Sequence, residues 1–375
     1  MGIPFNQPFL TGRETEYIRQ AVASGKISGN GAFTQKCQRW LEERFGFRKV
    51  LLTTSCTDAL EMAAMLSGIG PGDEVIMPSF TFVSTALAFV RQGARIVFAD
   101  SLPDHPNLDL DRVEDLITPR TRALVVVHYA GMACDMDRAM DLAQRHGLLV
   151  VEDAAQAIDA TFKGRPLGGI GHLGCFSFHE TKNIISGEGG ALLVNDERFV
   201  RRSEIIWEKG TNRAEFFRGE VNKYGWVDTG SSFLPSEIIA AFLYAQLEHL
   251  DAIQDRRKSL WNTYAAELAG LAAQGRLLLP VIPPGASNNA HMFYVVCRSL
   301  DERTALIAHL KSRDILSVFH YLSLHRSPFY APLHDGRELP HADRFADCLL
   351  RLPMYYDLTT AQAAEVSAEV RRFFA

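Results

Sequence analysis

The stretch of residues 175–190, CFSFHETKNIISGEGG, places a lysine shortly after an apolar segment. We expect residues 174–178 to form a buried strand, so that Lys182 lies near its end among small polar residues. Burial lowers the pKa of an ammonium, and a lysine amine that is partly neutral can form an imine with an aldehyde. The aldehyde that such sites bind most often is pyridoxal 5'-phosphate (PLP), which needs a carboxylate for its ring nitrogen and a polar nest for its phosphate.

A candidate for the carboxylate lies in LLVVEDAAQAI, residues 148–158. The apolar run 148–151 predicts a buried strand, and a carboxylate at its C-terminal end faces the crevice in which open α/β sheets bind ligands. Asp153 would there hydrogen-bond the ring nitrogen and keep it protonated, and Gln156 would reach the phenolic oxygen of the ring. An aspartate after a strand is equally typical of a helix cap, here for a segment that starts at Ala154.

A candidate for the phosphate nest lies in LLTTSCTDALEMAAMLSGI, residues 51–69. It predicts a strand over 50–53 and an amphipathic helix over 57–66. The backbone N–H groups of Cys56 and Thr57 would point out of the helix N-terminus, where the helix dipole and unpaired donors attract an anion. The hydroxyl groups of Thr57 and Ser177 would add to the nest. The same run is also typical of an ordinary N-cap.

An aromatic segment, PSFTFVSTALAFV at residues 78–90, follows the next predicted strand. Phe82 in this segment would lie against the face of a pyridine ring, or it would belong to the core. His128, which follows the predicted strand 123–127, is expected to be a hydrogen-bonded structural residue.

The spacing of the apolar runs predicts the fold class. Short runs alternate with helical windows, which indicates an α/β domain whose mostly parallel sheet is covered on both faces. The expected strands of this sheet are residues 50–53, 74–77, 96–99, 123–127, 148–151, 174–178 and 190–194. We expect a large domain over residues 1–250. A small α/β domain over 251–375 would hold short strands near 293–297 and 315–319.

The composition and charge of the chain argue against several classes of function. The 375 residues suit two domains, and the net charge of −5 gives no general basic field for nucleic acid or an anionic membrane. Six scattered cysteines without metal-binding spacing are typical of a reduced, cytoplasmic protein, and we expect no metal site. The N-terminus shows no signal peptide, and no apolar run is long enough to span a bilayer.

Two further segments supply candidates for substrate binding. The long polar and aromatic loop from residue 209 to 232 contains Lys209, Arg213 and Arg218, which suit a pyrophosphate or belong to a solvated loop. The segment FHYLSLHRSP, residues 319–328, puts His320 and Tyr321 near a strand end, where they would line a substrate pocket or have structural roles.

Five segments in this order, SCTDAL, PSFTFVSTA, VVEDAAQ, CFSFHETKN and GEGGAL, resemble the DegT/DnrJ/EryC1/StrS family of sugar aminotransferases. The resemblance implies the type I, aspartate aminotransferase-like PLP fold and a homodimer with shared active sites. It implies that Phe82 stacks on the cofactor and that Lys182 distinguishes the chain from the 3-dehydratase members, which carry histidine there. Family members usually have an asparagine in a GxNYR run where this chain has GSSFL, so Ser232 would contact the cofactor phosphate of the other subunit.

The segments FHETKN, KGTNR with FFRG, DTGSS and FHY resemble the family members that form dTDP-4-amino-4,6-dideoxygalactose. This likeness implies transfer of an amino group from L-glutamate to C4 of a dTDP-4-keto-6-deoxyhexose. The product would serve cell-surface polysaccharides such as enterobacterial common antigen and lipopolysaccharide. Two alternatives stay open, namely a PLP aminotransferase for another keto position or nucleotide, and a family member without catalytic activity.

Overall fold

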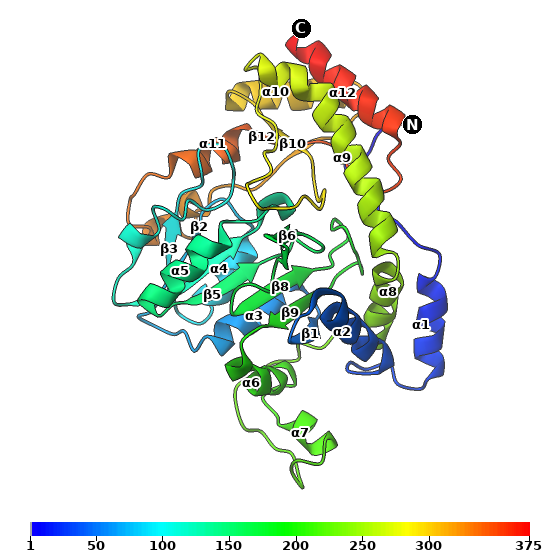
Figure 1. Cartoon of the computed structure of the whole chain (residues 1–375), viewed down its shortest axis with the longest axis vertical. Helices are drawn as coiled ribbons and strands as arrows, with labels where there is room; N and C mark the ends of the chain where they lie inside the picture. Colours follow the sequence, from blue (N-terminus) through cyan, green and yellow to red (C-terminus); the bar gives the residue numbers. More distant parts are fainter. Residues whose placement is uncertain (1) are drawn as a thin grey trace.

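A seven-stranded sheet forms the centre of the computed structural model, which describes residues 2–375 (Figure 1). Its strands are β1 (Lys49–Thr53), β2 (Glu74–Pro78), β3 (Arg95–Ala99), β4 (Thr121–Val127), β5 (Leu149–Asp153), β8 (Leu173–Ser177) and β9 (Gly190–Val194). Their order is β1-β9-β8-β5-β4-β2-β3, and only β9 runs antiparallel to its neighbours. The predicted mostly parallel sheet is therefore confirmed.

Helices cover both faces of this sheet because its strands are apolar on both sides. Leu52 and Leu124 pack in one buried cluster with α1 (Glu14–Ala23), α2 (Ala32–Phe45), α5 (Met136–His146) and α8 (Glu237–Leu247). Leu51 and Val125, one residue away along their strands, pack in a second cluster with α3 (Cys56–Leu66), α4 (Val83–Val90) and α6 (Glu197–Trp207). A short hairpin of β6 (Thr161–Phe162) and β7 (Arg165–Pro166) completes this part of the chain.

The C-terminal part contains a three-stranded antiparallel sheet of order β10-β12-β11. It comprises β10 (Tyr294–Val296), β11 (Val318–Phe319) and β12 (Leu349–Arg351), with helices α9 (Leu250–Ala273), α10 (Leu300–Lys311), α11 (Pro340–Cys348) and α12 (Thr360–Phe374). Tyr264, Leu306 and Val366 belong to a third buried cluster beside this sheet. We propose that the two domains meet at residue 250, where α9 begins and leads from the large sheet to α10 and α12 (Figure 1).

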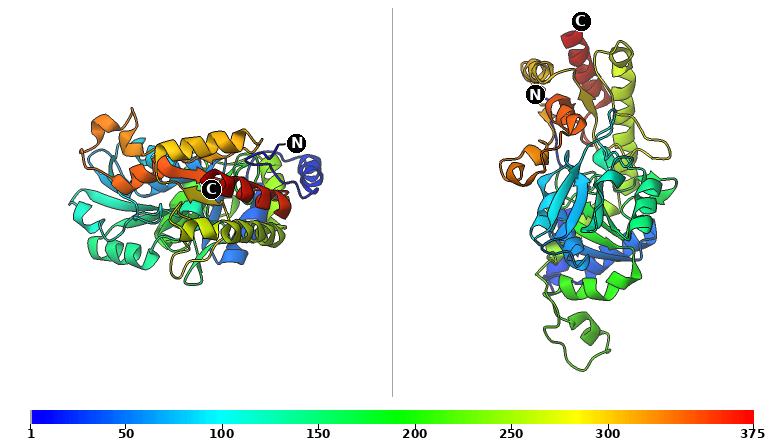
Figure 2. Two further views of the ribbon diagram at one scale, coloured as in Figure 1. Left: turned by 90° about the horizontal axis from the view of Figure 1, so that it is seen from above. Right: turned by 90° about the vertical axis from the view of Figure 1, so that its left-hand side faces the viewer.

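Short 3₁₀ turns occur in four loops, at Glu114–Leu116, Tyr129–Gly131, Leu324–Arg326 and Ala331–Leu333. The loop after α6 is different, because it projects from the rest of the chain as an arm (Figures 1 and 2). It contains a five-residue helix, α7 (Arg213–Phe217), that the sequence did not predict. Several large apolar side chains of the arm are exposed, among them Phe217 at 69% and Trp226 at 85%.

Residues 2–375 contain neither a candidate membrane-spanning helix nor a candidate metal-binding cluster. No helix in this range is both long and apolar enough to cross a membrane. The same residues bring together no group of three or more His, Cys, Asp and Glu side chains that could hold a metal ion.

Candidate active site

A cavity of about 580 Å³ opens where β4, β5 and β8 end, beneath residues of the three-stranded sheet. Strands that run parallel in a sheet present their C-terminal ends along one edge, which is where α/β proteins bind ligands. The predicted residues that line the cavity are Cys56, Thr57, Phe82, Asp153, Gln156, Ser177, Lys182, His320 and Tyr321. The fold thus brings together residues that the sequence separates by more than 200 positions.

Lys182 lies on a loop that leaves β8 and returns to β9. The backbone N–H of Phe178 donates to the carbonyl of Gly189 at 2.8 Å, which closes this loop. A turn inside it, in which the N–H of Lys182 donates to the carbonyl of His179 at 2.9 Å, directs the lysine to the cavity. Burial lowers the pKa of Lys182, although the nearby Cys56 and Asp153 act in the opposite direction.

Asp153 is the last residue of β5 and is only 5% exposed. Its Oδ2 accepts a hydrogen bond from Thr85 Oγ1 at 2.7 Å, and its Oδ1 accepts one from the N–H of Ala155 at 3.2 Å. Burial raises the pKa of this carboxyl, whereas both hydrogen bonds lower it. No helix begins at Ala154, so the alternative role of Asp153 as a helix cap is wrong.

The N-terminus of α3 carries donors that would suit an anion. Ser55 is its N-cap, and Ser55 Oγ accepts from the N–H of Asp58 at 3.1 Å. The N–H groups of Cys56 and Thr57 donate to no backbone or side-chain atom of residues 2–375. Both residues line the cavity together with Ser177, and Thr57 Oγ1 lies 2.7 Å from Ser84 Oγ. The segment is thus an ordinary N-cap that leaves two amides free for an anion.

Gly190 allows this helix end to sit close to the sheet. A Cβ at position 190 would lie 2.4 Å from the carbonyl carbon of Ser55 and 2.5 Å from the nitrogen of Cys56. Atoms of residues that are not linked to each other do not approach so closely, so any residue larger than glycine would push the helix end away from the strand. The glycine-rich end of the stretch 175–190 therefore sets how closely the N-terminus of α3 approaches β9.

Aromatic and amide groups form the opposite side of the cavity. Phe82 precedes α4 and is 55% exposed, with its ring centroid 6.0 Å from that of Tyr321. Gln156 Nε2 donates to the hydroxyl of Tyr321 at 3.0 Å, and Gln156 Oε1 accepts from the N–H of Ala130 at 2.6 Å. Tyr321 has a left-handed backbone, with φ of 52°, which is uncommon for residues with a Cβ and often marks functional sites.

These residues fit PLP. The cavity contains an amine with a lowered pKa, a buried carboxylate, free amides beside hydroxyl groups, and an exposed aromatic face. The amine matches the aldehyde of the cofactor and the carboxylate matches its ring nitrogen. The amides and hydroxyl groups match its phosphate, and the aromatic side chain matches the face of its ring. When bound, PLP supplies an electron sink that stabilises negative charge at the substrate carbon.

The predicted residues of the arm do not line this cavity. Ser232, Lys209 and Arg213 line a separate cavity of about 450 Å³. Arg218 is bound in ion pairs, with Glu204 at 2.8 Å and Glu220 at 2.7 Å. Within one chain, these four residues therefore lie apart from Lys182.

Among the residues in or beside the cavity that the sequence did not point to are Thr85 and Arg351. Thr85 lies in the first turn of α4 and Thr81 just before this helix, and their hydroxyl oxygens are 2.8 Å apart. Arg351 lines the cavity from β12. The only sequence signal for it was an arginine inside the apolar run LLRLPM of residues 349–354.

His128 has the structural role that the sequence suggested. It is fully buried, and its Nε2 lies 2.9 Å from Oε2 of Glu152, whose carboxylate also accepts from the N–H groups of Gly168 and Ile170 at 2.8 and 2.7 Å. The hydrogen bonds from Gly168 and Ile170 to Glu152 hold the loop before β8 against the end of β5.

Comparison with known proteins identifies the family of this chain. The model of the DegT/DnrJ/EryC1/StrS aminotransferase family matches residues 8–371. The dTDP-3-amino-3,4,6-trideoxy-alpha-D-glucose transaminase of Streptomyces venezuelae is 40% identical over 319 residues, which are 84% of this chain and 80% of that protein. The GDP-perosamine synthase of Caulobacter vibrioides is 33% identical over 368 residues, which are 96% and 95% of the two chains.

A solved structure extends the likeness to three dimensions. The crystal structure of S. venezuelae DesV in complex with a ketimine intermediate is similar with a TM-score of 0.90 and 35% identity, covering 99% of this chain and 98% of that one. The large mostly parallel sheet is consistent with the type I PLP fold expected from the sequence. The chain belongs to the DegT/DnrJ/EryC1/StrS aminotransferase family and is a PLP-dependent sugar aminotransferase.

Proposed function

We propose that this enzyme transfers the amino group of L-glutamate to C4 of a dTDP-4-keto-6-deoxyhexose and forms dTDP-4-amino-4,6-dideoxygalactose for cell-surface polysaccharides. One observation supports the transfer chemistry above all others. Lys182, with its lowered pKa, lines the same cavity as the buried carboxylate of Asp153. An amine of this kind serves as a general base and then as a general acid near neutral pH.

The residues of the cavity that the sequence predicted each have a defined task in this proposal. Lys182 Nζ removes the proton from Cα of L-glutamate, and in the second half-reaction it delivers a proton to C4 of the sugar. Asp153 keeps a proton on the ring nitrogen of the cofactor, and Phe82 and Gln156 orient the ring. The Cys56 amide, Thr57 and Ser177 hold the phosphate. His320 and Tyr321, on the other wall of the cavity, contact the hexose.

The identity of the sugar nucleotide depends on sequence likeness. The segments FHETKN, KGTNR, DTGSS and FHY of this chain favour dTDP and C4. The two relatives are named for different products, one a dTDP-linked 3-amino sugar and the other GDP-perosamine. The carbon of the sugar that is aminated and the nucleotide that carries the sugar therefore have to be tested together.

We propose a homodimer in which the arm of one chain reaches the cavity of the other. Support comes from the exposed Phe217 and Trp226 on the projecting arm, and from Ser232, which lies in a cavity without Lys182. Ser232 would then contact the cofactor phosphate of the second subunit, and Lys209, Arg213 and Arg218 would face its nucleotide pyrophosphate. All six cysteines are free thiols, which supports a cytoplasmic enzyme.

A substrate panel tests the reaction. The PLP form is mixed with L-glutamate, and conversion to the amino form of the cofactor is followed by absorbance. The amino form then receives 3-keto or 4-keto sugars linked to dTDP, GDP or UDP, and NMR of the product locates the new C–N bond. We expect turnover with the dTDP-4-keto sugar and background turnover by Lys182→Ala. A preference for a 3-keto sugar or for GDP would contradict the proposed substrate.

A subunit-mixing experiment tests the shared site. Lys182→Ala and Ser232→Trp are each expected to abolish most activity when pure. If Ser232 acts in the partner's cavity, a mixed dimer of the two variants has one intact site and regains up to half the activity per dimer of the wild type. No recovery after mixing, with subunit exchange verified by mass spectrometry, would show that Ser232 and Lys182 act within one chain.

A further inference from the structure

We propose that Arg351 binds a carboxylate of the amino-acid donor and so positions the donor for reaction with the group at Lys182. This inference rests on the proposed function, because it assumes that an amino acid supplies the nitrogen. It assigns a task to a residue that the catalytic scheme above does not use.

The position of Arg351 is fixed by the three-stranded sheet. It is the last residue of β12, the central strand, and is paired with Tyr294 on one side and Val318 on the other. Its side chain lines the cavity that contains Lys182, beside Phe5 and Phe319. Pairing on both sides fixes the backbone of Arg351, so its side chain starts from a defined point on the cavity wall.

The guanidinium lacks a counter-ion. Its Cζ lies 4.7 Å from the ring centroid of Phe5, and Nη2 makes only a long hydrogen bond of 3.5 Å to the carbonyl of Phe319. Its Nε is buried and has no hydrogen-bond partner in residues 2–375. Buried donors of a charged group without partners are costly, so this guanidinium is suited to an anion from outside the chain.

Burial lowers the pKa of Arg351, and the nearby hydroxyl groups of Tyr129 and Tyr321 oppose this shift. No carboxylate of residues 2–375 contributes to its pKa. The buried imidazoles of His291 and His320 have lowered pKa values and are neutral at pH 7. Arg351 is thus the cation of this cavity wall that persists at neutral pH.

The position of the Arg351 guanidinium favours the carboxylate of an amino acid over the diphosphate of a sugar nucleotide. Arg351 lines the same cavity as Lys182, His291 and His320, so it faces the space in which the amine reacts. In an amino acid, the α-carboxylate is bonded to the carbon that carries the reacting nitrogen. In a 4-keto sugar nucleotide, the diphosphate is attached at C1, across the hexose ring from C4. A planar guanidinium with free donors also matches the fork of one carboxylate.

Two variants and a control separate donor binding from other roles. Arg351→Gln removes the charge, Arg351→Lys keeps it without the planar fork, and Arg326→Gln removes an exposed arginine that pairs with Asp343. For Arg351→Gln we expect the L-glutamate concentration at half-saturation to rise roughly 30- to 100-fold. The lysine variant would be intermediate, and the Arg326 variant unchanged. The second half-reaction, from the amino form of the cofactor with the sugar nucleotide, would change less than about threefold.

A binding measurement gives a readout that needs no turnover. Glutarate, a dicarboxylate without an amino group, is titrated into the PLP-loaded protein by calorimetry. We expect Arg351→Gln to weaken its binding by about the same factor as it weakens L-glutamate. Thermal melting of all variants shows whether they fold alike.

The possible failures are distinct. A loss confined to the sugar half-reaction would show that Arg351 binds the diphosphate, and an equal loss in both halves would show a structural role; each overturns the inference. Glutarate binding that is absent in the wild type, or unchanged in Arg351→Gln, overturns it as well. If the wild type binds glutarate through Arg351 but aminates none of the sugar nucleotides, the proposed function fails and the assignment of Arg351 stands.

Discussion

The hydroxyl of Thr85 donates a hydrogen bond of 2.7 Å to Oδ2 of Asp153, although the two residues are 68 positions apart. Thr85 is fully buried on α4, and its Oγ1 lies 2.8 Å from Thr81 Oγ1. Burial raises the pKa of Asp153, and this hydrogen bond is the largest effect that lowers it. Thr85 therefore helps to keep the carboxylate ionised and pointed into the cavity.

We predict that Thr85→Val weakens PLP binding roughly 10-fold, because Asp153 becomes easier to protonate and loses its fixed orientation. Thr85→Ser keeps a hydroxyl and should bind PLP within about threefold of the wild type. The dissociation constant is measured by fluorescence titration of PLP into cofactor-free protein between pH 6 and 9. Equal affinity of the valine and serine variants would show that the Thr85 hydroxyl has no influence on the cofactor.

The lowered pKa of Lys182 also predicts a pH-dependent cost to folding. The unfolded lysine binds a proton up to a pKa of about 10.4, whereas the buried one releases it at lower pH. At a pH between the folded and the unfolded pKa of Lys182, the unfolded state holds more protons, so the free energy of unfolding rises with pH. Below the folded pKa, the full cost of burying the protonated amine is present. Replacing the lysine with an uncharged side chain of similar length removes this penalty.

We therefore expect cofactor-free Lys182→Met to melt a few degrees above the cofactor-free wild type at pH 7, with a smaller gap at pH 10. Melting is followed by circular dichroism. The same variant should yield no PLP-modified peptide after borohydride reduction and mass spectrometry, while the wild type is modified at Lys182. A melting difference that grows toward pH 10 would contradict the assigned direction of the pKa shift.

The sequence predicted those parts of the site that lie directly after strands. Asp153 ends β5, Ser177 ends β8 and Lys182 follows β8, so the apolar runs placed them at one edge of the sheet. The expected strand 190–194 agrees with β9 (Gly190–Val194), because apolar runs between turn residues define buried strands well.

Contacts between distant segments could not be predicted in the same way. Arg351 reaches the cavity only because β12 lies between β10 and β11, and nothing in residues 349–354 specifies that strand order. The direction of the arm that carries Ser232 is likewise set by packing and not by local pattern. Such residues need the fold, since their partners are fixed by tertiary structure and not by spacing.

The close approach of Gly190 to the N-terminus of α3 gives a third prediction. In Gly190→Ala the new methyl group would lie 2.4 Å from the carbonyl carbon of Ser55, so the helix end must move away from β9. We expect a loss of about 1–3 kcal/mol in the free energy of unfolding and weaker binding of inorganic phosphate.

The control for this variant is Gly70→Ala, where no atom lies within 4 Å of the added Cβ. Both variants are measured by urea denaturation in the absence of PLP, and by calorimetry with phosphate. A Gly190→Ala protein as stable as Gly70→Ala would mean that the contact relaxes without cost.

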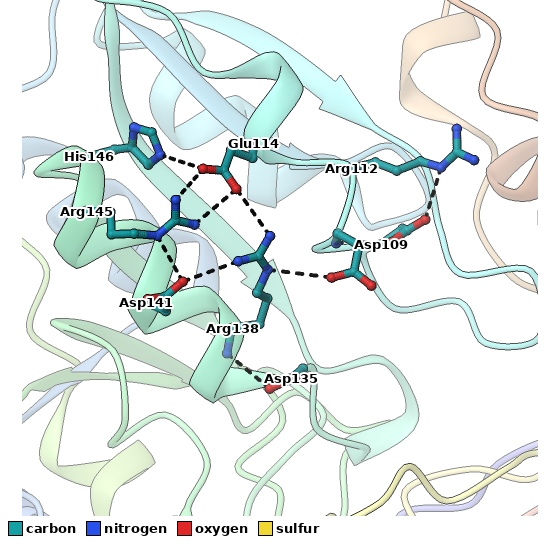
Figure 3. Close-up of polar contacts among 9 residues, drawn as sticks. Asp109, Arg112, Glu114, Asp135, Arg138, Asp141, Arg145 and His146 are labelled. Atoms are coloured by element: carbon teal, nitrogen blue, oxygen red, sulfur yellow. Dashed lines mark hydrogen bonds and ion pairs between the residues drawn. The ribbon is translucent and has the colours of Figure 1, made fainter.

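A cluster of ion pairs on α5 gives a prediction about salt and pH (Figure 3). Glu114 pairs with Arg138 at 3.2 Å and also with Arg145 and His146, and Asp141 is 3.0 Å from Arg145. The hydrogen bond from Arg145 lowers the pKa of Glu114 from 4.5 to about 2. Because the folded value is the lower one, the stabilisation is present above pH 4.5 and is lost as the pH falls toward 2.

We predict that Glu114→Gln lowers the melting temperature at pH 7 in low salt, and that adding NaCl reduces the difference because these charges are exposed to solvent. Glu43→Gln, an exposed glutamate on α2, serves as the control and should show neither effect. At pH 3 the gap between Glu114→Gln and the wild type should be smaller than at pH 7, since part of the wild-type stabilisation has been titrated away. A difference that persists unchanged in high salt would indicate that Glu114 stabilises the segment before β4 by packing and not by charge.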